Sequence, residues 1–68
     1  MRIDKNKLEL VRARKNISVK DIIAAGIPKP TYYKMRRGEN ILPNTAGKLA
    51  RILDVDVLEI VQEEKDGL

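Results

Sequence analysis

The chain contains neither cysteine nor histidine. No disulfide or thiolate metal site can therefore stabilise it, and the commonest metal ligand and general base are also missing. The sequence has no glycine-rich phosphate loop, and it offers no paired carboxylates in an apolar setting, since Glu63 and Glu64 lie in a polar tail. These absences remove the usual components of an active site, so we expect no enzyme activity, no metal and no cofactor.

Long hydrophobic runs are missing as well. No stretch approaches the ~20 consecutive apolar residues that a membrane-spanning helix needs. The first ten residues, MRIDKNKLEL, contain no continuous apolar run, which argues against a signal peptide. The absence of cysteine fits a reducing compartment. We therefore expect no membrane association and a location in the cytosol.

Positive charge is unevenly distributed along the chain. The formal net charge is +4, from 14 basic and 10 acidic residues. Residues 1–37 hold 11 lysines and arginines against 3 acids, whereas residues 38–68 hold 3 against 7. A basic half attracts a polyanion and an acidic half faces away from it. The alternative is ordinary solvated surface charge.

The length of 68 residues suits one small domain, which we place over residues 1–63, with a polar tail at 64–68. A core of this size without disulfides needs closely packed short helices. No segment alternates apolar and polar residues between turn signals, as a strand would. The sequence therefore predicts an all-α fold, a compact bundle of four to five short helices.

The first two helices have clear start and stop signals. A helix over 5–15 follows Asp4 as its N-cap and ends at Asn16, which suits a left-handed position. A second helix over 18–25 opens with Ser18 and an acid three residues later, close to a capping box. Gly26 ends it.

The later helices are marked by proline, asparagine and acidic residues. A third helix is expected over 30–37, with Pro30 at its first position. A fourth over 45–53 would have Asn44 as its cap, and a fifth over 57–63 would open with a second capping box. The residues expected to face the core are Leu8, Val11, Ile22, Ile23, Tyr32, Met35, Ile41, Leu42, Ala46, Leu49, Ile52, Leu53, Val55, Val57, Ile60 and Val61.

Residues 18–38, SVKDIIAAGIPKPTYYKMRRG, have the layout of a helix-turn-helix. A first short helix is anchored in the core, Gly26 permits a sharp turn, and a second helix presents its basic, tyrosine-bearing face outward. The remaining helices would hold the second one at a fixed angle. Gly47, inside the fourth helix, would permit a close contact with a neighbouring helix or with DNA.

The order and spacing of these residues resemble the Cro/repressor-type (XRE-like) helix-turn-helix regulators of phages and bacteria, over residues 5–61. The resemblance implies a lambda-repressor-like DNA-binding domain in the bacterial cytoplasm or nucleoid, including that of a phage-infected host. The matching positions are Leu8, Val11, Arg12, Ser18, Gly26, Ile27, Thr31, Tyr32, Met35, Gly38, Pro43, Leu49, Ala50, Leu53, Val55, Asp56 and Val57.

Three features depart from that family. Val19 stands where the family often has a glutamine that contacts a phosphate. Arg36 stands where it often has a glutamate near the end of the recognition helix. The second helix is also one residue short before Gly26, so the angle between the two helices of the motif would differ.

The resemblance implies sequence-specific binding of a double-stranded DNA operator by a small Cro-like transcriptional repressor, with the recognition helix in the major groove. A homodimer on two half-sites is expected, with Leu58 and Val55 as interface candidates, although Leu58 could equally be a lone exposed leucine. Base-reading candidates are Lys29, Thr31, Tyr33 and Lys34. Phosphate-contact candidates are Arg36, Arg37, Asn44, Lys48 and Lys20, with a weaker case for Arg14.

A second function remains open at this point. The same fold can serve as a protein-interaction module, an anti-repressor or co-repressor that binds another regulator through its helix-turn-helix face. Val19, Pro30 and the aromatic Tyr33 favour this alternative slightly. Sequence-selective DNA binding would distinguish the two functions.

Overall fold

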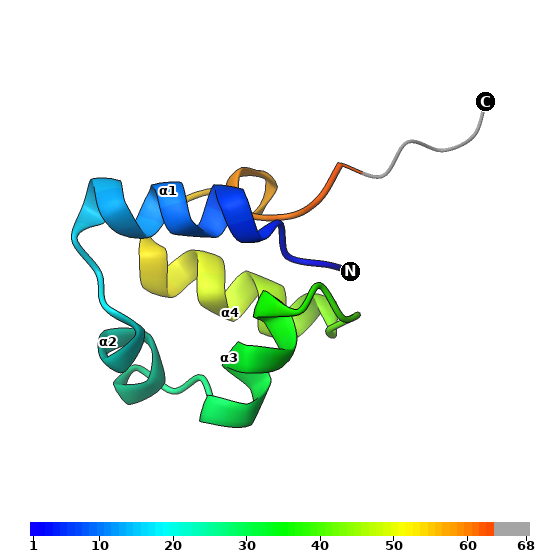
Figure 1. Cartoon of the computed structure of the whole chain (residues 1–68), viewed down its shortest axis with the longest axis horizontal. Helices are drawn as coiled ribbons and strands as arrows, with labels where there is room; N and C mark the ends of the chain where they lie inside the picture. Colours follow the sequence, from blue (N-terminus) through cyan, green and yellow to red (C-terminus); the bar gives the residue numbers. More distant parts are fainter. Residues whose placement is uncertain (64–68) are drawn as a thin grey trace.

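Four α-helices and one short 3₁₀ turn make up the computed structural model, which describes residues 1–63 (Figure 1). No strand occurs in that range, and one isolated bridge pairs Ile3 with Val61. The predicted all-α bundle is thereby confirmed. The elements are α1 (Lys5–Lys15), α2 (Val19–Ala24), α3 (Lys29–Arg36), α4 (Pro43–Leu53) and the 3₁₀ turn η1 (Val57–Glu59).

Helix α1 begins and ends where the sequence predicts. The Asp4 carboxylate accepts hydrogen bonds from the backbone N–H groups of Asn6 and Lys7, at 2.9 and 3.1 Å. Asn16 ends the helix in the left-handed region, at φ 55°. Both ends are therefore closed by local hydrogen bonds, which leaves the apolar stripe of α1 free to pack on the core.

Helix α2 forms the predicted capping box. The Ser18 hydroxyl accepts from the Asp21 N–H at 3.1 Å, and the Asp21 carboxylate accepts from the Ser18 N–H at 3.0 Å. The helix ends at Ala24, one residue before the predicted end, because Ala25 serves as the C-cap. Gly26 then takes φ +120°, a conformation that side chains rarely adopt, and turns the chain toward α3.

Helix α3 lies one residue earlier than predicted at both ends. It starts at Lys29 with Pro28 in the cap position, so Pro30 occupies the second helical position rather than the first. Either position suits proline, since the N–H groups of the first turn have no partner within the helix. As predicted, Tyr32 and Met35 are fully buried.

Helix α4 starts two residues earlier than predicted. Pro43 is its first residue and Leu42 its N-cap, without a side-chain cap, so the assignment of Asn44 as the cap was wrong. The fixed φ of proline suits the first helical position, which explains the earlier start. As a consequence Leu42 points outward and is 70% exposed, against the prediction that it would pack on the core, whereas Ile41 is buried.

The prediction of a fifth helix over 57–63 is wrong, and it is the largest difference between the predicted and the observed fold. The capping box of Asp56 and Glu59 is present, but it opens only the single turn η1. Beyond it the chain becomes extended, because backbone bonds to the N-terminal segment replace helical ones. Asp4 N–H donates to Ile60 O at 2.8 Å, and Gln62 N–H donates to Arg2 O at 2.9 Å. The predicted tail at 64–68 lies outside the described residues.

Within residues 1–63 the core consists of hydrophobic residues, and the Tyr32 hydroxyl is a polar group buried among them. Val55, Val57 and Ile52, expected to be buried, are only partly so and pack against its edge, as do Ile17 and Val19. The Cα radius of gyration of the chain, 11.4 Å, is close to the ~11 Å expected for a compact chain of this length. The buried members are Ile3, Leu8, Val11, Ile22, Ile27, Tyr32, Met35, Ile41, Ala46, Leu49, Ala50, Leu53, Ile60 and Val61.

The arrangement places α2 and α3 together on one side of the molecule. In Figure 1, α4 runs through the middle, with α1 and η1 above it and with α2 and α3 below. None of the helices in residues 1–63 is long and apolar enough to cross a membrane. A four-residue turn, 25–28, joins α2 to α3 and sets how α3 is presented.

Candidate nucleic-acid interface

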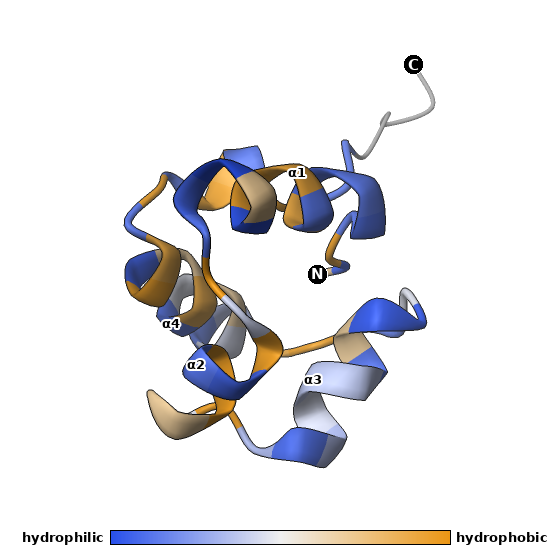
Figure 2. Cartoon of the chain, turned by 60° about the vertical axis from the view of Figure 1, so that its left-hand side comes forward, coloured by the Kyte–Doolittle hydropathy of each residue, from blue (hydrophilic) through white to orange (hydrophobic). Residues whose placement is uncertain are grey.

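Helix α3 buries one stripe and exposes the rest of its surface. With Tyr32 and Met35 in the core, the exposed positions fall on two edges, since a helix turns about 100° per residue. Lys29, Tyr33 and Arg36 follow one edge, at steps of four and three. In Figure 2, α3 is pale or blue along most of its length, in keeping with a solvent-facing helix.

Thr31 and Lys34 lie on the other edge and line a groove. The remaining lining residues come from the N-terminus, the loop after α3 and the start of α4: Met1, Asn40, Ile41, Leu42 and Thr45. The four predicted base-reading residues are therefore divided, with Thr31 and Lys34 at the groove and Lys29 and Tyr33 on the opposite edge. Pro30 and Arg37, seven residues apart, lie between the two edges.

The two tyrosines of α3 have different environments. Tyr33 is 40% exposed, and its ring lies edge-on to that of Tyr32, with centroids 5.8 Å apart. The Tyr32 hydroxyl is fully buried and forms no well-aligned hydrogen bond within residues 1–63, with the Arg12 guanidinium as its nearby polar neighbour. Burial raises the pKa of Tyr32 above its ordinary value, an effect that the nearby Arg12 charge opposes.

Two of the predicted phosphate-contact arginines lie beside carboxylates. The Arg36 guanidinium is 3.7 Å from Glu9 Oε1 of α1, and Arg37 Nε donates to Glu39 Oε2 at 2.6 Å. All four side chains are at least one-third exposed. By contrast, Lys29 and Lys34 form no ion pair with any residue of the part of the chain that is described.

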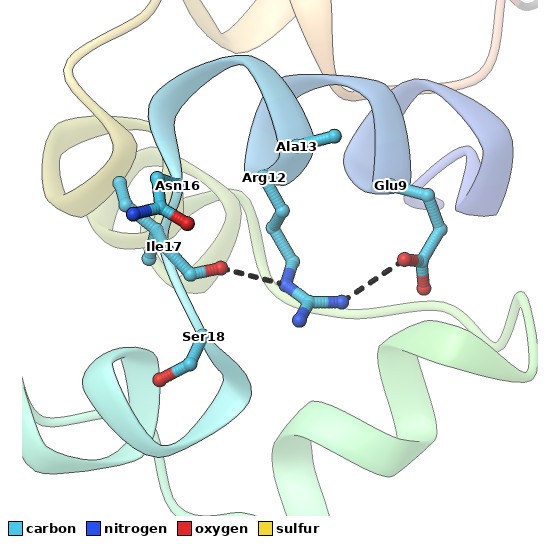
Figure 3. Close-up of a pocket in the computed structure, with 6 residues that line it drawn as sticks. All are labelled: Glu9, Arg12, Ala13, Asn16, Ile17 and Ser18. Carbon is cyan, nitrogen blue, oxygen red and sulfur yellow. Dashed lines mark hydrogen bonds and ion pairs between the residues drawn. The ribbon is translucent and has the colours of Figure 1, made fainter.

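Glu9 also contacts a second arginine. Arg12 donates from one guanidinium nitrogen to Glu9 Oε2 at 3.0 Å and from Nε to the Ile17 carbonyl at 3.1 Å (Figure 3). These bonds fix Arg12 along a surface hollow between α1 and the start of α2. Arg12 is therefore held by groups of the protein itself. Glu9 lies between two arginines, with Arg12 on α1 and Arg36 at the end of α3.

The other phosphate candidates lie on α2 and α4. Lys20 and Asn44 are exposed. Lys48 is exposed as well, and its ammonium lies over the turn between α2 and α3, where a Cβ added at Gly26 would be 2.9 Å from Lys48 Nζ. Arg14 forms an ion pair with Glu59 at 3.1 Å, on the α1–η1 side of the molecule.

The candidate dimer residues lie away from α3. Leu58, on η1, is 72% exposed, as expected of a residue off the core face, while Val55 is partly buried against the core. Leu10, which the sequence analysis did not single out, is 71% exposed on α1, the neighbour of η1. Two large apolar side chains thus lie open to solvent on this side.

Glu9 and Glu39 were not predicted as site residues from the sequence. The i,i+3 spacing of Glu9 and Arg12 and the closeness of Glu39 to Arg37 were readable signals. The contact between Glu9 and Arg36 joins residues far apart in the chain and had no local signal. No group of acidic residues in residues 1–63 is arranged to hold a metal ion.

No family model matches the chain, and neither curated proteins nor solved structures yield a match to it. The case for a candidate interface at α3 therefore depends on the geometry and charge of this chain's own residues.

Proposed function

We propose that the protein binds double-stranded DNA sequence-specifically as a small Cro-like repressor, with α3 as its recognition helix. The observation that carries the proposal is the surface of α3: one stripe is buried, and the exposed remainder holds no acidic residue and two lysines that form no ion pair within residues 1–63. An α-helix with its side chains is about 10–12 Å across, which fits the ~12 Å width of the major groove.

The side chains of α3 offer two kinds of contact to a duplex. Lys34 could donate to guanine acceptors and the Thr31 methyl could contact a thymine methyl, both from the groove edge. Arg36, Arg37 and Lys48 suit phosphates, which position a protein without reading sequence. A single module of this size covers few base pairs, so we infer a homodimer on two half-sites about one helical turn apart.

Selection of bound duplexes from a random pool at moderate salt tests the proposal. We expect a palindrome whose half-sites are about one turn apart. Lys34→Ala should then weaken binding to that site much more than to random duplex, while Lys5→Ala, an exposed lysine of α1, should affect both little. Recovery of unselective sequences only would contradict the proposal.

A protein-interaction role is the second candidate, and one observation favours it. Tyr33, Leu42 and Met1 are exposed on or beside α3, and Leu42 and Met1 line the groove of Thr31 and Lys34. Exposed apolar side chains next to lysines suit docking to an acidic protein surface. In that case selection would return no palindrome, and Tyr33→Ala would abolish binding to a partner regulator.

A further inference from the structure

We propose that Glu9 and Glu39 mask the phosphate-binding charge at the end of α3, so that DNA must displace a carboxylate to engage Arg36 or Arg37. This inference depends on the proposed DNA binding and adds a function for two residues outside the reading face. It predicts that both carboxylates lower the affinity for the nucleic-acid backbone.

Ion pairs are unevenly distributed around α3. Both arginines at its C-terminal end have a carboxylate within 4 Å, from two different elements. Neither lysine on its reading edges has one within residues 1–63. At α3 and its C-cap, charge is therefore neutralised at the two arginines that would contact phosphates and left free at the two lysines that would contact bases. The phosphate candidates on other helices, Lys20 and Lys48, have no carboxylate within 4 Å in residues 1–63 either, so the masking concerns the end of α3 alone.

Each of the two arginines can exchange its carboxylate partner for a DNA phosphate. The Arg36–Glu9 contact is long, at 3.7 Å, and both side chains are more than one-third exposed. The Arg37–Glu39 pair is short, at 2.6 Å, but lies on an exposed loop. Exposed ion pairs contribute little to stability, so a phosphate can compete for either arginine without unfolding the protein.

Glu9 would keep a charged partner after Arg36 moves to a phosphate. When Arg36 turns to a phosphate, Glu9 keeps its 3.0 Å contact with Arg12, which remains held by the Ile17 carbonyl. The carboxylate therefore has a charged partner in both states. Arg12 acts here as the fixed partner, and Arg36 as the one that moves.

The test measures the affinity of Glu9→Gln and Glu39→Gln for a labelled duplex of random sequence as salt is varied. Each variant should bind about two- to fivefold more tightly, since the strength of an exposed ion pair limits the gain. Each salt slope should steepen by up to about 0.9, the value for one added phosphate contact. Glutamine keeps the shape of the side chain, and thermal melting verifies folding.

Two controls isolate the masking. The gain from Glu9→Gln should vanish when Arg36→Gln is also present, and that from Glu39→Gln should vanish with Arg37→Gln. Asp54→Asn makes the same change in net charge at the C-terminal end of α4 and preserves a residue type that accepts the left-handed conformation there. It should change the affinity less than either glutamine variant.

The outcomes separate the two claims. Unchanged or weaker binding of both glutamine variants, or an equal gain from Asp54→Asn, would overturn the masking while leaving DNA binding in place. Failure of the wild-type protein to bind any duplex would overturn the proposed function itself.

Discussion

Polar side chains in this protein differ in whether their polar atoms have hydrogen-bond partners. Ser18 and Asp21 satisfy each other's backbone groups, and Arg12 is bonded to a carboxylate and to a carbonyl. The Tyr32 hydroxyl is the exception among the described side chains, fully buried without a partner. These contrasts give two predictions about individual side chains.

Tyr32→Phe should leave the free energy of unfolding unchanged or raise it by up to about 1 kcal/mol, because a buried hydroxyl without a hydrogen bond is unfavourable. Tyr33→Phe, on the neighbouring exposed ring, should stay within about 0.5 kcal/mol. Urea unfolding of the two variants measures both. A loss above about 1 kcal/mol for Tyr32→Phe would mean that its hydroxyl is hydrogen-bonded in solution.

The capping carboxylate of α2 should make stability depend on pH. The hydrogen bonds from Ser18 hold the pKa of Asp21 below its ordinary value of 3.8 in the folded protein. The stabilisation is therefore present above pH 3.8 and is lost as the pH falls through the lower folded pKa. Asp21→Asn, which does not titrate, should remove this part of the acid dependence.

Measuring the free energy of unfolding of wild type and Asp21→Asn as a function of acidic pH tests this prediction. The free-energy difference between wild type and Asp21→Asn should be constant well above pH 3.8 and should shrink below it. Parallel curves across the acid range would show that Asp21 does not have this role.

At the scale of elements, helices were predictable where their signals are local. The caps at Asp4, Ser18 and Asn16 act within a few residues of themselves, so their sequence pattern was sufficient. The fifth helix failed because residues 60–62 bond to residues 2–4, a competition that no local pattern reveals. The pairing of Glu9 with Arg36 escaped prediction for the same reason.

Helix α4 offers a test of an element as a whole. Nothing lies within 4 Å of a Cβ added at Gly47, so the expected close contact with a neighbouring helix is absent. Gly47→Ala should therefore raise the free energy of unfolding by about 0.5–1 kcal/mol through better helix propensity. If DNA approaches α4 closely at this residue, the stabilised variant will also bind DNA less tightly.

Gly26→Ala is the matched opposite. The residue has φ +120°, which is strained for any residue with a side chain, whereas the 2.9 Å approach of the added methyl to Lys48 Nζ is relieved when that flexible side chain moves. It should lower stability by more than about 1 kcal/mol. Thermal melting of the two alanine variants should thus shift in opposite directions, and shifts of the same sign would contradict this account of the turn.

At the scale of the whole molecule, the exposed apolar side chains Leu10 and Leu58 belong to α1 and η1, which lie across α4 from α3 (Figure 1). Leu58→Glu should dissociate a homodimer that uses this face, while leaving stability within about 0.5 kcal/mol because the side chain is exposed. Leu42→Glu, equally exposed but beside α3, should leave the oligomeric state unchanged. Sedimentation of both variants, without DNA, provides the measurement.

The backbone bonds between the two ends of the chain carry a kinetic consequence. The contacts within each helix are local and form quickly, whereas Asp4–Ile60 and Gln62–Arg2 close loops of most of the chain. We expect these bonds to form after the folding barrier is crossed, in which case weakening them would speed unfolding and leave the folding rate nearly unchanged. We therefore expect the backbone bonds between the two ends of the chain to determine how long the native state persists and to have little effect on how fast it forms.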